Sequence, residues 1–110
     1  MKLLSLDLNI EGLTLDAETQ KISNIELATR VIKNIILSYA QNQRGLSEEE
    51  RRKTYKIYDV LEEAVKEKKT TVEMEDDWFG FLKKCKLECK LFPDTALRRV
   101  EELIEATPNR

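Results

Sequence analysis

Apolar and polar residues alternate at the start of the chain, from Leu4 to Ile10. The apolar residues that share one side of this segment are Leu4, Leu6, Leu8 and Ile10. Because successive side chains of a strand point to opposite faces, this period of two predicts a half-buried β-strand over residues 3–10. Beyond a glycine turn, Leu13 and Leu15 predict a short second strand.

The pattern changes to a helical period after residue 22. Ser23 and Glu26 are spaced as a capping box, which predicts a helix from Ser23 to about Gln41. Its apolar residues are Ile25, Ala28, Val31, Ile32, Ile35, Ile36 and Tyr39. They cover more than half of the helix circumference, so we expect this helix to lie at the centre of the core. Leu37 is the exception, because it falls on the polar side.

A second helix is predicted after Gly45, which we expect to end the first helix in a left-handed conformation. Ser47 and Glu50 form a second capping box. Glutamates in the first turn and lysines in the last turn suit the helix dipole. The predicted inner face consists of Ile57, Tyr58, Leu61, Ala64 and Val65.

The last third of the chain predicts a strand and two helices. Val72 and Met74 restore the period of two, and we expect this short strand to pair with the N-terminal one. Asp76 is expected to cap a third helix over residues 77–90. After a proline, a fourth helix is predicted over residues 95–106. The expected fold class is therefore α+β, with about four helices packed on a small two- or three-stranded antiparallel sheet.

Composition supports one compact domain covering residues 1–110. Charged residues make up 36% of the chain, above the usual value of about 25%. The net charge of −2 gives no overall attraction to nucleic acid or to anionic lipid. Asp7 and Asn9 interrupt the leucines at the start, and no apolar stretch is long enough to span a membrane, so we expect a cytoplasmic protein without membrane contact.

Two cysteines lie four residues apart in the segment KKCKLECK. They continue one apolar stripe of the third helix, which consists of Trp78, Leu82, Cys85, Cys89 and Phe92. The chain contains no histidine, and a zinc site needs more ligands than this pair supplies. We favour core packing for Cys85 and Cys89 and expect no metal and no cofactor. The alternative is an enzyme that uses these thiols.

A basic cluster in the segment RRKTYK is the candidate for phosphate contact. Its residues are Arg51, Arg52, Lys53 and Lys56, joined by Arg44. Tyr55 lies among them. The favoured interpretation is a solvated helix face that the preceding glutamates neutralise. The alternative is a nucleic-acid contact, which would be sensitive to salt.

Three aromatic residues crowd the segment DDWFGFL. Trp78 and Phe81 can share one helix face, whereas Phe79 points elsewhere. We favour the core for these rings, with an exposed hot spot for a partner protein as the alternative. The candidate partner contacts are Leu37, Trp78 and Phe79. The acidic segment EMEDD before them lacks the glycine and the ligand spacing of a calcium loop.

The order of these parts resembles a family of small, uncharacterised bacteriophage and prophage proteins. The similarity runs from Ile22 to Ile104, through ISNIELATRVIKNII, the charged segment RGLSEEERRKTYK, the strand TVEMED and a terminal helix that follows a proline. The resemblance implies a phage-encoded accessory or virion protein, and it transfers no catalytic residue.

We therefore expect a non-enzymatic protein that acts through protein–protein interaction or self-association, in the cytoplasm of a bacterial host cell or in a virion. Homo-oligomers are compatible with this interpretation. The alternative is a nucleic-acid-binding accessory protein that uses the basic face of the second helix.

Overall fold

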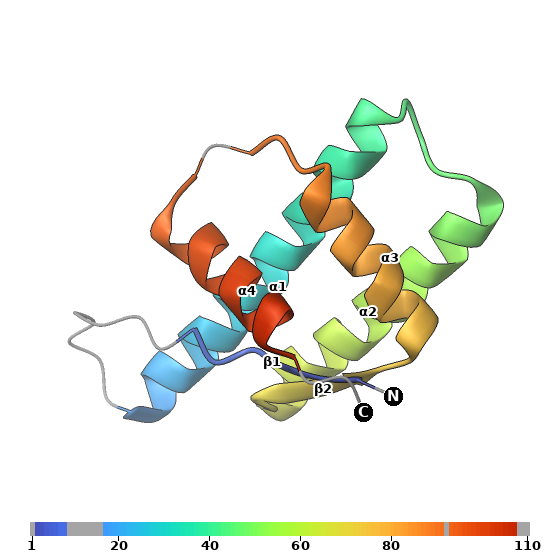
Figure 1. Ribbon diagram of the computed structural model, residues 1–110. Helices are drawn as coiled ribbons and strands as arrows, with labels where there is room; N and C mark the ends of the chain where they lie inside the picture. The colour runs from blue at the N-terminus through green and yellow to red at the C-terminus, as the bar shows by residue number, and fades with distance from the viewer. Residues whose placement is uncertain (1, 9–16, 92, 108–110) are drawn as a thin grey trace.

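Four helices pack on a two-stranded antiparallel sheet in the computed structural model, which describes residues 2–8, 17–91 and 93–107 (Figure 1). In chain order the elements are β1 (Lys2–Ser5), α1 (Ala17–Asn42), α2 (Glu48–Glu67), β2 (Thr71–Met74), α3 (Asp76–Leu87) and α4 (Thr95–Ala106). The expected α+β class with about four helices is confirmed.

The sheet pairs the N-terminal strand β1 with β2, which follows α2 in the chain. Leu4 lies opposite Val72 in the antiparallel register, as expected for the pairing of the N-terminal strand with the later one. Leu4, Leu6 and Leu8 are all buried, so the predicted inward side is confirmed. Regular strand structure ends at Ser5, earlier than predicted. The predicted positions Ile10, Leu13 and Leu15 lie outside the described residues.

Helix α1 is the centre of the fold and contacts α2, α3 and α4. The seven residues predicted for its inner face are all buried. The helix begins at Ala17, so the predicted cap at Ser23 is wrong and Ser23 lies inside the helix. The physical reason is that residues 17–22 are mostly good helix formers, so the helix extends through them. A serine with a glutamate three residues later also occurs inside helices and does not by itself mark a helix start.

A left-handed turn ends α1. The residue in the left-handed conformation is Arg44, with φ of 58°, and Gly45 follows it with φ of 118°. The Gly45 N–H donates to the carbonyl of Ala40 at 2.8 Å, and the Arg44 N–H donates to the carbonyl of Gln41 at 3.2 Å. This is the Schellman pattern with glycine one position later than expected. Gly45 thus belongs to the helix stop, but Arg44 takes the strained position.

The capping box at the start of α2 is confirmed. The Ser47 hydroxyl accepts the Glu50 N–H at 3.2 Å, and the Glu50 carboxylate accepts the Ser47 N–H at 3.1 Å. Three residues of the predicted inner face are buried, namely Ile57, Leu61 and Ala64. The other two, Tyr58 and Val65, are half-buried and pack against the core.

The two C-terminal helices differ in how they begin. The N-cap of α3 is Glu75, without a side-chain hydrogen bond, so the predicted cap at Asp76 is wrong. Asp76 instead lies in the first turn, where its negative charge interacts favourably with the positive end of the helix dipole. Helix α4 covers the predicted residues 95–106, and the Asp94 carboxylate accepts the Leu97 N–H at 2.7 Å.

Candidate functional site

The two cysteines do not form a common reactive site. Cys85 is fully buried in the core, whereas Cys89 is half-buried beyond the end of α3, and both are free thiols. Burial, with a smaller contribution from the Glu50 charge, raises the pKa of Cys85 to about 12. Core packing is confirmed for Cys85. Within residues 2–8, 17–91 and 93–107, no group of three acidic, cysteine or histidine side chains is arranged to hold a metal ion.

A polar contact that the sequence pattern does not indicate connects three helices. The Tyr39 hydroxyl of α1 donates to the Glu50 carboxylate of α2 at 2.7 Å. The Lys84 ammonium of α3 lies 3.9 Å from the same carboxylate and 5.5 Å from the centre of the Tyr39 ring. The Tyr39 bond lowers the pKa of Glu50, and burial raises the pKa of Tyr39. The contact therefore favours a charged Glu50 and a neutral Tyr39, as in a structural clamp.

Replacing Tyr39 by phenylalanine is expected to cost about 1 kcal/mol at neutral pH, the typical value of one hydrogen bond. Because the folded pKa of Glu50 is lowered from 4.5, its contribution to stability is present above that pH and is lost as pH falls through the folded value. Tyr39→Phe should weaken this acid dependence, measured by urea unfolding between about pH 5 and pH 3. Tyr58→Phe is the control, and an unchanged acid dependence in Tyr39→Phe would contradict the clamp.

The basic cluster is only partly brought together. Arg51, Arg52 and Lys56 line one shallow depression on α2, beside Tyr55, which is 61% exposed. Glu48 and Asp59 lie in the same depression and reduce its positive charge. The Lys53 ammonium lies 3.5 Å from the Glu49 carboxylate. Arg44 is exposed just after the end of α1. In the described part of the chain, only Lys53 of this cluster has an ion pair with the preceding glutamates.

The three candidate partner contacts lie in different environments. Phe79 is only 3% exposed, which favours the core interpretation for this ring. Leu37 is 52% exposed, and its neighbours on that side of α1, Asn34 and Gln41, are exposed polar residues. Leu37 is therefore an isolated apolar side chain on a polar, solvent-exposed side of α1. Trp78 is half-buried and contributes to a groove.

This groove, called the edge groove below, runs along the outer edge of β2. Its lining comes from β1, α2, the turn before β2, β2 itself and the start of α3: Leu3, Val60, Glu63, Lys69, Thr71, Val72, Glu73, Glu75 and Trp78. In Figure 1, β2 lies at the base of the molecule, with α4 on the β1 side and α2 behind the sheet. The groove has a mixed lining, in which four apolar side chains, Trp78 among them, lie with three carboxylates, a lysine and a threonine.

The hydrogen-bond pattern leaves the β2 edge open to the groove. The Leu6 N–H donates to the carbonyl of Thr70 at 2.7 Å, so this pair is a hydrogen-bonded one. Because hydrogen-bonded pairs alternate along an antiparallel ladder, Val72 and Met74 direct their peptide groups to β1. Thr71 and Glu73 direct theirs away from β1, to the side where no further strand is present among the described residues.

The charge of the edge groove is negative. Lys69 is 3.6 Å from the Glu63 carboxylate and 2.9 Å from that of Glu67, so this cation is already paired. Glu73 is exposed on the outer face of the sheet, and Glu75 is exposed at the start of α3. In the part of the chain that the structure describes, neither carboxylate has an ion pair or a side-chain hydrogen bond.

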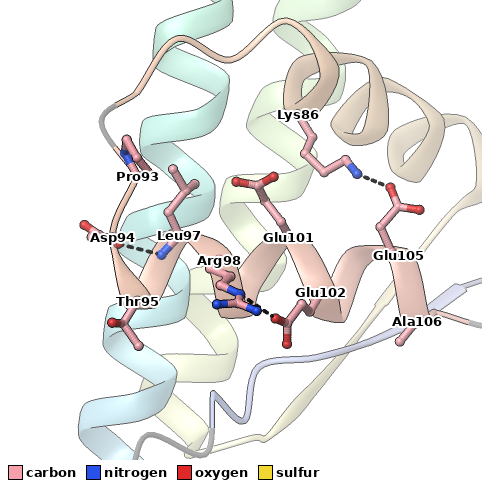
Figure 2. Close-up of a pocket in the computed structure, with 10 residues that line it drawn as sticks. All are labelled: Lys86, Pro93, Asp94, Thr95, Leu97, Arg98, Glu101, Glu102, Glu105 and Ala106. Carbon is pink, nitrogen blue, oxygen red and sulfur yellow. Dashed lines mark hydrogen bonds and ion pairs between the residues drawn. The ribbon is translucent and has the colours of Figure 1, made fainter.

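A larger depression follows the outer face of α4, and most of its charged groups already have partners within the protein. Figure 2 shows Lys86 of α3 in contact with Glu105 and Arg98 in contact with Glu102. The Asp94 carboxylate is used in the helix cap. These pairs indicate a solvated helix face, which is the ordinary arrangement for exposed ions.

The chain was compared with protein families, curated proteins and solved structures. No family model matches it, and neither a curated protein nor a solved structure does. Among the described residues, the helices are too short or too polar to cross a membrane.

Proposed function

We propose that the protein acts by binding another protein and not by catalysis. The observation that carries this proposal is the edge groove, where the half-buried Trp78 ring lies beside peptide groups of β2 that pair with no other strand among the described residues. Tryptophan is enriched among the residues that dominate binding energy at protein interfaces. The burial of Cys85 and the raised pKa of its thiol argue against its use as a nucleophile.

The proposed setting is that of a phage or prophage accessory or virion protein, in the cytoplasm of a bacterial host cell or in a virion. This part rests on the sequence resemblance between Ile22 and Ile104. Self-association is the second form of the same function, and exposed Leu37 is the candidate contact for it.

Site-specific photo-crosslinking in cells that naturally produce the protein tests the proposal. A crosslinking amino acid at Leu3, on the rim of the edge groove, is expected to give one discrete species of higher mass. The same amino acid at Leu87, which is 79% exposed at the far end of α3, is the control and should give none. No crosslink from Leu3, together with a monomer in sedimentation at high concentration, would contradict protein binding.

A second candidate function is nucleic-acid binding by α2. The observation in its favour is that Arg51, Arg52 and Lys56 line one depression with the exposed Tyr55, and in the described part of the chain none of these three cations forms an ion pair with a first-turn glutamate. Arginine and an exposed ring are suited to phosphate contact and to base stacking.

Heparin chromatography and binding to a labelled oligonucleotide at low salt test this second function. If α2 binds nucleic acid, changing Arg51 and Arg52 together to glutamate should abolish retention, and added salt should weaken binding steeply. Changing Arg98 to glutamate on α4 is a control that also removes an exposed arginine. Absence of retention by the unchanged protein would eliminate this candidate.

A further inference from the structure

We propose that the open edge of β2 binds an extended, basic and apolar segment of another protein, which adds to the sheet as a third strand. This inference rests on the proposed protein-binding function and specifies its ligand. It combines three observations made on residues 2–8, 17–91 and 93–107: a sheet edge without a further strand, a groove at that edge, and carboxylates there without an ion pair.

The backbone supplies the first part of the recognition. Thr71 and Glu73 direct one N–H and one C=O each toward the groove, as the register of β1 and β2 requires. An added strand would lie about 4.8 Å from β2 and pair with these groups. Strand addition of this kind derives affinity from main-chain hydrogen bonds and specificity from alternate side chains.

The two faces of the added strand would meet different surfaces. On the outer face of the sheet, its side chains would lie beside Glu73, which has no ion pair among the described residues, and a lysine or arginine would be attracted there. On the inner face, its side chains would point toward the flank of α2 at Val60 and toward Trp78. A segment that alternates basic and β-branched residues fits both faces.

A second copy of the chain is a poor occupant by the same criteria. Pairing of two β2 edges would bring Glu73 and Glu75 of both copies together, and like charges across strands are destabilising. The β1 edge of a copy is next to α4, which contacts β1, and Arg99 of α4 donates to the carbonyl of Leu8 at 2.9 Å. Edge charges are also a common device against self-pairing, and here they select a partner of opposite charge.

Trp78 is the only tryptophan of the chain, so its fluorescence reports occupancy of the edge groove. The probe is the acetylated and amidated pentapeptide Lys-Val-Arg-Val-Lys, titrated into the full chain. We expect a saturable blue shift of the emission, because the peptide excludes water from the ring. The analogue Glu-Val-Glu-Val-Glu should bind at least tenfold more weakly.

Two further comparisons separate strand addition from simple charge attraction. A peptide that is N-methylated at alternate residues, so that the donors facing β2 are lost, should bind at least tenfold more weakly. Glu73→Lys should weaken binding to the same extent, whereas Glu88→Lys should change it less than twofold. Glu88 follows the last residue of α3, about 15 Å along the helix axis from Trp78.

Each remaining outcome overturns the inference. Equal binding of the methylated peptide, an unchanged affinity in Glu73→Lys, or no saturable shift up to millimolar peptide would exclude strand addition. A blue shift that depends on protein concentration without peptide, with a dimer in sedimentation, would make a second copy the occupant. In all these cases crosslinking from Leu3 still decides separately whether the protein binds a partner.

Discussion

Replacing Ile35 by alanine is expected to lower the free energy of unfolding by about 2–5 kcal/mol. Ile35 is completely buried on α1, the helix that contacts all three other helices. The substitution removes apolar contacts and leaves a cavity that the surrounding helices can fill only partly. Because domains of this size are stable by about 5–15 kcal/mol, one such change removes a large part of the total.

Equilibrium unfolding in urea measures this effect, and Leu37→Ala is its matched control. Leu37 lies on the same helix two residues later and is of equal size, but it is half-exposed, so its replacement should change stability by less than about 0.5 kcal/mol. Similar losses in the two variants would contradict the assignment of the α1 faces.

The second large effect is the protection of Cys85 from thiol reagents. Since its pKa is raised from 9.0 to about 12, only about one thiol in 10⁴ is ionised at pH 8, against about one in ten for an unshifted thiol. The reactive species is the thiolate. Reaction of Cys85 in the folded protein should therefore be roughly a thousandfold slower than in the unfolded chain.

The Cys89→Ser variant makes this measurement unambiguous, because Cys85 is then the only thiol. We expect no rapid labelling of this variant in native buffer and complete labelling in denaturant. Because the folded pKa is raised from 9.0, this thiol should also stabilise the fold below that pH and lose this contribution as pH rises toward the folded value. Rapid native labelling of Cys85 would contradict its burial and reopen the enzyme alternative.

Features set by neighbouring residues could be predicted from the sequence. The cap of α2 depends on Ser47 and Glu50, three residues apart, and the start of α4 depends on Asp94. The buried sides of β1 and α1 follow from regular spacing of apolar residues. The start of α1 was mispredicted at Ser23 because a capping pattern does not distinguish a helix start from a helix interior when helix formers precede it.

Features set by packing between distant segments could not be predicted in the same way. The helical pattern shows that Trp78 and Phe79 lie on different faces of α3, but not which neighbours cover each face. Phe79 is buried, and Trp78 remains half-exposed beside the sheet. The bond between Tyr39 and Glu50 likewise depends on how α1 and α2 lie against each other.

The edge groove is the strongest example of this limit. The pairing of the strands was predicted, but the direction of each peptide group depends on the register, in which Leu3 lies opposite Glu73. A shift of one residue would turn Val72 away from the core and reverse which amides face β1. The open amides of Thr71 and Glu73 are therefore a property of the folded chain and not of its local pattern.

Amide hydrogen exchange at single-residue resolution tests the central claim most directly, that β2 offers an open edge for a partner strand. In the free protein we expect rapid exchange at Thr71 and Glu73 and slow exchange at Val72 and Met74. With saturating basic peptide, the amides of Thr71 and Glu73 should become protected as well. Protection of these two amides in the free protein, or their continued rapid exchange in the presence of bound peptide, would contradict the claim.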